Sequence, residues 1–443
     1  MKTVLLIAYY FPPSGGPGGQ RILKFVKYLP EFGYRPIVLT VTKDADFPAR
    51  DESLFSEIPS TTRIYRSFIL EPYHLYRRIT GRGSEEAIDI ATLEKGTRRG
   101  FGERTASWVR ANCFIPDARI GWLPFGVERG LEIIRRNRVD VIFTSSPPYT
   151  VSLIGMMLHM ITGKPWVADF RDPWTGFLSA PQRRFAARKI DHALEGAVVQ
   201  KADRITVAWQ GIAQNLFGKH PEVDRSKAAL ISNGYDFDPV DRPVKKNARF
   251  TTTYSGSLYG RRDPEGLVRA LAQMMREDPA FKDRFLLRIV GRVGPGIAEM
   301  LRETLPKACL EIVPYVPHRE AVAYLFRSDV LLLIVDEAPE AAFIVPGKVF
   351  EYLGVRKPVL ALAPQGDVAR ILAKTRAGVT VSGRDAAGIA RALWDFYRRW
   401  EQNTLDDRGM DLDAIRRYSR RTQTKALAGV FDETLFATKS LSH

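Results

Sequence analysis

The sequence predicts an α/β protein built from two doubly wound domains that face a cleft. Three observations lead to this prediction. The chain has 443 residues, which is too long for one ordinary hydrophobic core. Short apolar segments typical of buried strands alternate with segments of helical periodicity, and this alternation occurs in two successive series. A stretch of turn-forming residues separates the two series.

The first series begins with a strand at residues 4–10, whose continuous apolar character is typical of a parallel sheet buried on both faces. A Pro/Gly loop and a helix carrying Ile22 and Leu29 follow, and residues 37–41 form the next strand. Residues 48–119 are irregular and rich in arginine, so we expect an insertion with some helix. The later expected elements are strands at 139–144, 166–170 and 205–208 and a helix at 149–161.

The second series follows the turn residues at 233–236, where we place the interdomain linker. Its expected strands lie at 250–254, 285–290, 310–313, 330–335 and 358–362. The predicted domains are therefore residues 1–240 and 241–400, followed by a helical segment at 401–443 that packs back toward the first domain. Ligands of such sheets bind beyond the carboxyl ends of the strands.

Composition indicates an ordinary folded protein, with 45% hydrophobic and 26% charged residues. The longest apolar runs are much shorter than the roughly 20 residues of a membrane-spanning helix. Residues 9–13 are aromatic and proline-rich where a signal peptide would carry small residues, so we interpret the first apolar run as a strand. Two distant cysteines, Cys113 and Cys309, suit a reducing compartment. We expect a cytoplasmic protein.

The net charge of +16 would attract phosphates or anionic lipid headgroups. The basic segment at 183–190 carries Arg183, Arg184, Arg188 and Lys189 and predicts peripheral contact with the inner face of the membrane, although a solvated helix face fits equally well. A nucleic-acid partner is not expected, because the chain has no helix-turn-helix, zinc-ligand pattern or aromatic RNA-binding strand.

The first candidate ligand-binding stretch is the glycine-rich loop at 11–21, between the first strand and the first helix. Gly15 and Gly16 would let backbone amides approach a phosphate at the helix start. The spacing is not G-x-G-x-x-G, which disfavours a nicotinamide dinucleotide. A connection that binds nothing is the alternative.

The second candidate stretch follows the strand at 166–170 and offers Asp169, Arg171 and Asp172 as catalytic residues. Charged side chains directly after a buried strand lie where a ligand site would open. A structural pair between Asp169 and Arg171 is equally compatible with the sequence.

The third candidate stretch, residues 254–264, again joins a strand to a helix. Gly256 and Ser257 could approach a ligand closely, and Arg261 and Arg262 offer planar donors to a diphosphate. A solvated turn is the alternative.

The fourth candidate stretch is residues 343–354. Lys348 stands in the first turn of a predicted helix, and Glu351 lies one turn later on nearly the same face. A lysine for phosphate and a carboxylate for ribose hydroxyls would thus point to one place. Simple pairing of the two on the helix surface is the alternative.

Taken together, these stretches resemble the family-4 glycosyltransferases, in particular a bacterial branch of polysaccharide and cell-envelope synthesis. The resemblance rests on residues 11–16, 169–174, 233–236 and 346–352. It implies the GT-B architecture, with two Rossmann-like domains around a central cleft, residues 1–240 on the acceptor side and residues 241–400 binding the nucleotide-sugar donor. It also implies retaining transfer of a sugar from a nucleoside diphosphate donor without a bound metal or other cofactor, and it implies that Glu351 holds the donor ribose.

Two departures from the family pattern limit this transfer of roles. The first glutamate of the family's E-x7-E pair falls on Phe343, so its role is unfilled or moved to Glu337 or Glu340. Ser257 stands where the family has an arginine, and no lysine follows it. We expect substitution by Arg261, Arg262 and Lys348.

The expected partners are therefore a nucleotide-sugar donor and a glycan, lipid-linked or small-molecule acceptor. A D-x-D pattern at residues 236–238 lies in the linker, which disfavours metal binding there. The competing enzyme class is a nucleotide-sugar 2-epimerase of the same architecture, which would need no acceptor.

Overall fold

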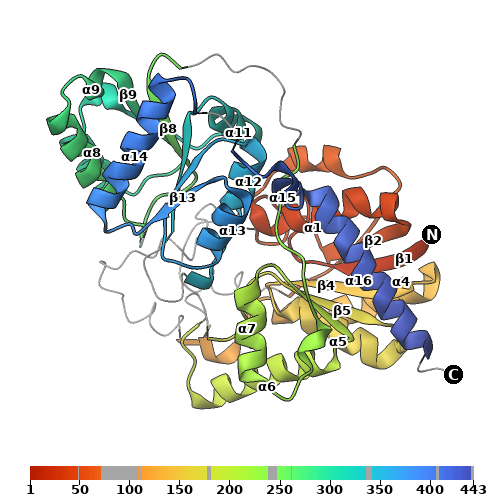
Figure 1. Ribbon diagram of the computed structural model, residues 1–443. Helices are drawn as coiled ribbons and strands as arrows, with labels where there is room; N and C mark the ends of the chain where they lie inside the picture. Colours follow the sequence, from red (N-terminus) through yellow and green to blue (C-terminus); the bar gives the residue numbers. More distant parts are fainter. Residues whose placement is uncertain are drawn as a thin grey trace. The chain divides into compact units, whose positions relative to one another are not determined.

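The computed structural model describes most of the chain as two compact units (Figure 1). Unit 1 is Met1–Asn233 together with Arg420–His443, and unit 2 is Gly234–Ser419. Each unit is described by itself. The described residues are 1–47, 49–70, 108, 109, 111–176, 181–237, 247–260, 262–335, 342–405 and 409–440.

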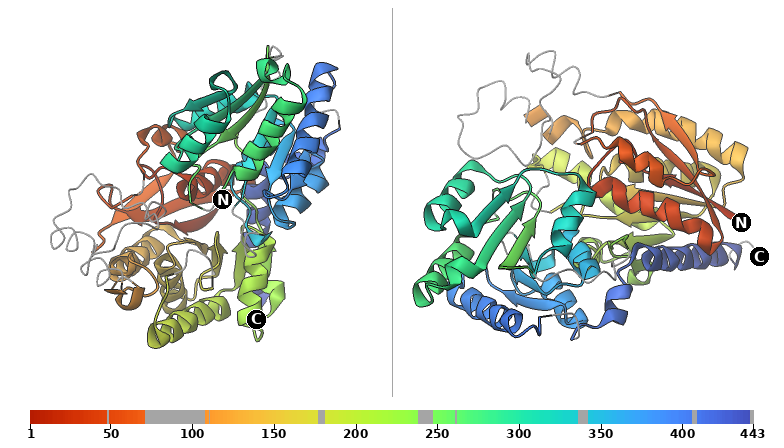
Figure 2. Two further views of the ribbon diagram at one scale, coloured as in Figure 1. Left: turned by 90° about the vertical axis from the view of Figure 1, so that its left-hand side faces the viewer. Right: turned by 90° about the horizontal axis from the view of Figure 1, so that it is seen from above.

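The described part of unit 1 contains a seven-stranded parallel sheet with the order β3-β2-β1-β4-β5-β6-β7. Helices lie on both of its faces (Figures 1 and 2). Its strands are β1 (Lys2–Ile7), β2 (Tyr34–Val41), β3 (Arg63–Ser67), β4 (Val141–Ser146), β5 (Trp166–Phe170), β6 (Arg204–Val207) and β7 (Ala228–Leu230). Its α-helices are α1 (Pro17–Tyr28), α4 (Leu123–Asn137), α5 (Thr150–Thr162), α6 (Phe185–Lys201), α7 (Gln210–Lys219) and α16 (Arg420–Ser440).

The last helix of the chain, α16, belongs to unit 1 and packs against α1. The Phe431 ring of α16 lies 5.2 Å from the Tyr34 ring and 5.6 Å from the Phe143 ring, measured between centroids. These aromatic contacts belong to a core whose members are almost fully buried. The last helix therefore helps to bury one face of the first sheet.

The described part of unit 2 contains a six-stranded parallel sheet with the order β10-β9-β8-β11-β12-β13. Its strands are β8 (Phe250–Ser255), β9 (Phe285–Val290), β10 (Leu310–Val313), β11 (Val330–Ile334), β12 (Val359–Leu362) and β13 (Gly378–Val381). Its α-helices are α8 (Glu265–Glu277), α9 (Phe281–Arg284), α10 (Pro295–Thr304), α11 (His318–Phe326), α12 (Lys348–Val355), α13 (Asp367–Thr375), α14 (Ala386–Glu401) and α15 (Leu412–Arg416).

Parallel register brings the carboxyl ends of neighbouring strands together in each unit. In unit 1, Ser145 of β4 is opposite Asp169 of β5. In unit 2, Ser255 of β8 is opposite Val290 of β9. The loops that follow these strands are therefore neighbours, and they carry most of the predicted site residues.

The predicted α/β class, with two largely parallel sheets, is confirmed. Sequence analysis missed β3, which lies inside the stretch expected to be an irregular insertion and pairs with β2 along five residues. Unit 2 extends to Ser419, and the α16 helix that follows belongs to unit 1. In the described ranges, no helix combines the length and apolar character needed to cross a membrane.

Candidate functional site

The loops after β8 and β9 are held together by two glycines of unusual conformation. Gly256 has φ 114° and Gly291 has φ 136°, values that L side chains rarely adopt. The amide of Gly256 donates to the carbonyl of Val290 at 2.7 Å. A Cβ atom at Gly291 would lie 2.4 Å from the Gly256 carbonyl oxygen. The close approach therefore requires glycine after both strands, and Gly291 was not among the predicted site residues.

Lys348, the first residue of α12, fills the space that Gly256 leaves open. Its Nζ donates to the Tyr254 hydroxyl at 2.8 Å and lies 4.2 Å from the centroid of the same ring. A Cβ atom at Gly256 would lie 2.3 Å from that Nζ. Gly256 is thus the glycine that admits the lysine, a role that only the fold reveals. Tyr254 is a second contact that sequence analysis missed.

Tyr352 anchors α12 so that Lys348 faces the end of β8. The Ser255 amide donates to the Tyr352 hydroxyl, which in turn donates to the Leu332 carbonyl, both at 3.1 Å. Burial raises the pKa of Tyr352, so this hydroxyl stays protonated. The helix carrying the lysine is therefore tied to two neighbouring strands.

The pKa of Lys348 is lowered to about 7, mainly by burial and also by the positive charge of Arg262, while Glu351 acts in the opposite direction. Desolvation disfavours the charged amine, and an anion close to it would restore the charge. The residue as a whole is only partly buried. This is the electrostatic setting of an anion-binding group.

Arg262 reinforces the same loop from inside. Its Nη1 donates to the Ser257 carbonyl at 3.2 Å, and the Tyr254 hydroxyl donates to that carbonyl at 2.8 Å. Ser257 therefore contributes its backbone oxygen to the loop structure. Arg262 stands close enough to Lys348 for their charges to interact.

Glu351 lies one turn after Lys348 on α12, as the sequence predicted, but its direct partner comes from another helix. Its Oε1 lies 2.9 Å from Nε2 of His318, the first residue of α11. The Glu351 side chain is 31% exposed. His318 was missed because it is 33 residues away in sequence, and no motif marks it.

In unit 1, the structure gives Asp169 a structural role in place of the predicted catalytic one. Its carboxylate is fully buried and accepts four hydrogen bonds. Arg21 donates two of them, at 3.0 and 2.8 Å, and Ser145 and Thr206 donate the others at 2.7 Å each. Every lone-pair direction is occupied, so no reacting group can reach it. The partner is Arg21 of α1 rather than Arg171.

The Arg171 guanidinium is likewise occupied by contacts within the fold. The structure thus gives it a structural role in place of the predicted catalytic one. Its guanidinium donates to the backbone carbonyls of Gly18, in the first turn of α1, and of Ser146 and Pro147, at the end of β4. Burial lowers the pKa of this side chain, and these carbonyls offset the cost of burying its charge.

Asp172 is the member of this stretch that retains an available carboxylate. Within the described part of the chain, no side chain or amide donates a hydrogen bond to its carboxylate oxygens. Burial raises the pKa of its carboxyl, and the positive Arg171 next to it lowers it. We retain Asp172 as the candidate acid or base of unit 1.

The glycine-rich loop before α1 is held on one side and open on the other. The Gly15 amide donates to the Ala49 carbonyl at 2.9 Å, so that amide is not available to a phosphate. Gly16 has φ 83° and would have nothing within 4 Å of an added Cβ atom. Of the two predicted glycines, Gly16 alone keeps open space around it.

Four residues named in the predictions lie outside the described part of the chain. They are Arg261, with its diphosphate role, Glu337 and Glu340, as substitutes for the first family glutamate, and Asp238, the second aspartate of the D-x-D pattern. Phe343, at the position of that first glutamate, is 49% exposed.

Arg183, predicted to face a membrane, is instead buried, with its side chain 4% exposed. It pairs with Asp191 at 2.7 Å and donates to three backbone carbonyls between residues 111 and 116. The exposed basic residues of the segment are therefore Arg184, Arg188 and Lys189.

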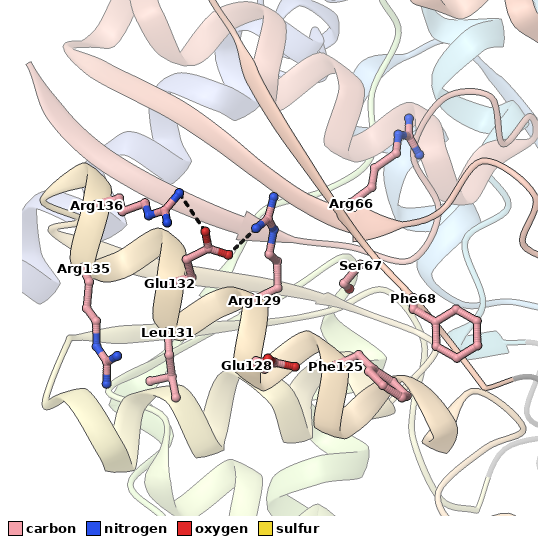
Figure 3. Close-up of a pocket in the computed structure, with 10 residues that line it drawn as sticks. All are labelled: Arg66, Ser67, Phe68, Phe125, Glu128, Arg129, Leu131, Glu132, Arg135 and Arg136. Carbon is pink, nitrogen blue, oxygen red and sulfur yellow. Dashed lines mark hydrogen bonds and ion pairs between the residues drawn. The ribbon is translucent and has the colours of Figure 1, made fainter.

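A cavity of about 660 Å³ lies between β3 and α4 and contains none of the predicted site residues (Figure 3). Glu132 bridges two of its arginines, Arg129 and Arg136. Arg66 donates to the Val41 and Pro12 carbonyls. The lining carries four arginines and two glutamates, so the cavity keeps a net positive charge, but the desolvated Lys348 and the paired glycines lie instead at the ends of β8 and β9.

Comparison with known proteins adds family evidence to this geometry. Residues 73–239 match the model of Glycosyltransferase Family 4. A D-inositol 3-phosphate glycosyltransferase of Streptomyces scabiei is 27% identical over 218 residues, which cover 46% of this chain and 48% of the relative. One from Geodermatophilus obscurus is 25% identical over 224 residues, 45% of this chain and 46% of the relative. The chain thus matches about half the length of these curated relatives.

Solved structures show the fold over nearly the whole chain. A glycosyltransferase from Rickettsia africae superposes with a TM-score of 0.64 at 14% identity, covering 98% of both chains. Sucrose-phosphate synthase from Thermosynechococcus elongatus gives a TM-score of 0.62 at 15% identity, covering 99% of this chain and 100% of the other. Anabaena HepE, in complex with UDP-glucose, gives 0.58 at 12% identity, covering 98% of this chain and 100% of that one. The fold class is therefore GT-B, with two Rossmann-like domains.

Proposed function

We propose that this chain is a family-4 glycosyltransferase that transfers a sugar from a nucleoside diphosphate donor to a glycan, lipid-linked or small-molecule acceptor, with retention of anomeric configuration. The observation that carries the proposal is the buried amine of Lys348, seated against Gly256 beside Arg262 at the carboxyl end of β8. Such a desolvated cation calls for an anionic partner, and a diphosphate is the anion that a family member would bring.

The chemistry of sugar transfer explains why this amine is useful. The bond between the anomeric carbon and the diphosphate oxygen breaks, and negative charge grows on the leaving diphosphate. Positive groups placed in advance at that charge stabilise the transition state more than the ground state. We assign this role to Lys348 and Arg262, together with the start of α12. The proposed donor site uses no metal.

Glu351 is the proposed ligand of the donor ribose hydroxyls. It lies on the same helix as Lys348, one turn away, and its partly exposed carboxylate can accept hydrogen bonds. His318 would hold that carboxylate in position until the ribose hydroxyls arrive. Asp172 of unit 1 is the proposed acid or base on the acceptor side.

A substitution at Glu351 tests the assignment directly. Charge-assisted hydrogen bonds contribute about 1.5–3 kcal/mol each, so Glu351→Gln should weaken donor affinity at least about tenfold. His318→Ala removes the partner but keeps the carboxylate, so it should weaken affinity less than Glu351→Gln does. Nucleoside diphosphate affinity measured by calorimetry separates the two. Wild-type affinity in Glu351→Gln, with unchanged thermal stability, would refute the ribose role.

The donor and the reaction class need a second experiment. UDP is the first nucleotide to test, because HepE is described in complex with UDP-glucose, and thermal shifts with a panel of nucleoside diphosphates rank the bases. Donor turnover should depend on acceptor. Turnover of the free donor to its epimer without acceptor would instead establish the 2-epimerase. We also propose a cytoplasmic location, because the proposed donor substrates of the protein are nucleotide sugars.

A further inference from the structure

Three potential metal ligands meet in unit 1, whereas the proposed donor site belongs to unit 2. His192 and Glu195 lie three residues apart on α6, and His220 follows the last residue of α7 (Figure 1). One ligand atom from each of the three residues lies within 4.8 Å of the others. Glu195 is fully buried and His220 is 4% exposed, whereas the His192 side chain is half exposed. The cluster is therefore closed on the protein side and open on the other.

The two oxygens of Glu195 have different surroundings. Oε1 accepts from the Thr175 amide at 3.1 Å and from Lys219 Nζ at 2.6 Å. Oε2 accepts from the Thr175 hydroxyl at 2.7 Å. This second oxygen also lies 3.3 Å from His220 Nε2 and 3.8 Å from His192 Nδ1. One oxygen is thus bound to a lysine, while the other faces two imidazole nitrogens.

The surroundings of His220 Nδ1 bear on which of the two ring nitrogens carries the proton. His220 Nδ1 lies 3.8 Å from the Glu222 carboxylate, and Glu222 is itself held by Gln200 at 3.1 Å. If Nδ1 carries the proton toward Glu222, then Nε2 directs a lone pair at the Glu195 oxygen. A lone pair facing a carboxylate oxygen is unfavourable unless a cation lies between them. The two imidazole rings stack with centroids 4.7 Å apart, which also disfavours a positive charge on both.

We propose that His192 Nδ1, Glu195 Oε2 and His220 Nε2 bind one divalent transition metal ion of the zinc type. Two imidazoles and one carboxylate are a ligand set that zinc accepts, with a fourth position left for water on the exposed His192 side. The Glu222 carboxylate, 3.8 Å from Nδ1 of the ligating His220, would support the metal site through its negative charge. Lys219 stays on the opposite oxygen of Glu195.

The consequence of this site would be structural. Glu195 binds both the amide and the hydroxyl of Thr175, and Thr175 follows Asp172 by three residues. A metal on Glu195 would therefore fasten the loop after β5, which carries Asp172, to α6 and α7. The inference does not depend on the proposed sugar transfer, and the sequence did not reveal the site because Glu195 and His220 are 25 residues apart.

The test uses the full chain after removal of metals with a chelator. Zinc titrated by calorimetry should bind with one ion per chain and raise the thermal midpoint of unfolding. Cobalt, as a spectroscopic substitute, should show the visible absorption of a tetrahedral site. A Cys113→Ser background removes the exposed thiol as a competing ligand.

Variants locate the ion. His192→Ala changes an exposed side chain, so the fold should survive, and zinc affinity should fall at least tenfold. Glu222→Gln should weaken zinc by about 10–100-fold, as loss of a supporting carboxylate does. His159→Ala, a histidine outside the cluster, is the matched control and should bind zinc like the parent. Absence of zinc binding in the parent protein would overturn the proposal, and so would equal affinity in the parent and His192→Ala; either result would leave a protonated His–Glu network.

Discussion

The carboxyl end of β5 in unit 1 and the carboxyl end of β8 in unit 2 both gather charged residues, but these charges are compensated to very different degrees. In unit 1, Asp169 and Arg171 are saturated by internal hydrogen bonds. In unit 2, Lys348 is desolvated and has a hydroxyl and a ring as its described contacts, with no carboxylate in direct contact. The first arrangement stabilises a fold, and the second can stabilise a ligand. A charged residue at a strand end thus becomes a candidate for ligand binding when no group of opposite charge contacts it.

The largest expected effect is on folding stability and concerns the buried Asp169 of unit 1. Asp169→Ala would leave the Arg21 guanidinium buried without its counter-charge. Breaking a buried ion pair in this way costs about 3–5 kcal/mol. Denaturant unfolding should show that loss as a lower midpoint. A loss below about 1 kcal/mol would show that the network is not a structural element and would reopen a catalytic role for Asp169.

The second effect is on nucleotide affinity and concerns Lys348 of unit 2. Lys348→Ala should leave stability unchanged or raise it, because it removes a desolvated charge, while nucleoside diphosphate affinity falls by about 1.5–3 kcal/mol, roughly tenfold to a hundredfold. Lys374→Ala, an exposed lysine on α13 of the same unit, is the control. Calorimetric titration of both variants measures the difference. Equal affinities in the two would remove Lys348 from the donor site.

The third prediction uses the pKa of Lys348, which burial lowers from 10.5 to about 7. Because the unfolded chain keeps this proton up to its ordinary pKa, stability should rise with pH between about 7 and 10.5 from this group. A bound diphosphate favours the charged amine, so binding at pH 8 should take up a proton. Titration in buffers of different ionisation enthalpy measures that uptake. It should vanish in Lys348→Met, and no uptake in the wild type would contradict the ligand role.

The smallest effect per residue is expected at the surface of α6. Phe185 and Ile190 are 64% and 52% exposed beside Arg184, Arg188 and Lys189. Each basic residue near an anionic membrane contributes about 1 kcal/mol. Glutamate at these three positions should therefore reduce sedimentation with anionic vesicles at low salt.

A matched charge control distinguishes this surface from the net charge. Glutamate at three exposed basic positions of unit 2 changes the net charge equally; these are Arg269, Arg276 and Lys374. If both triple variants bind vesicles equally, the membrane surface proposed on α6 is wrong.

The site predictions divide according to how far apart the interacting residues are in sequence. Lys348 and Glu351 were placed one turn apart because helical periodicity is a local property. The pairing of Asp169 with Arg21 spans 148 positions, and that of Glu351 with His318 spans 33. The spacing of the two residues in each pair matches no sequence motif. Asp169 was therefore predicted to be catalytic, and His318 was overlooked.

By itself, the sequence determined the alternation of strands and helices, the two series, and the strand-end loops in which charged residues and glycines gather. These follow from apolar periodicity and turn chemistry, which act over a few residues. Only the tertiary structure decided which of those charges are compensated, that Gly256 makes room for Lys348, and that α16 completes the first unit. Compensation depends on which strands and helices become neighbours, and the free energy of burying a charge is set by those distant partners.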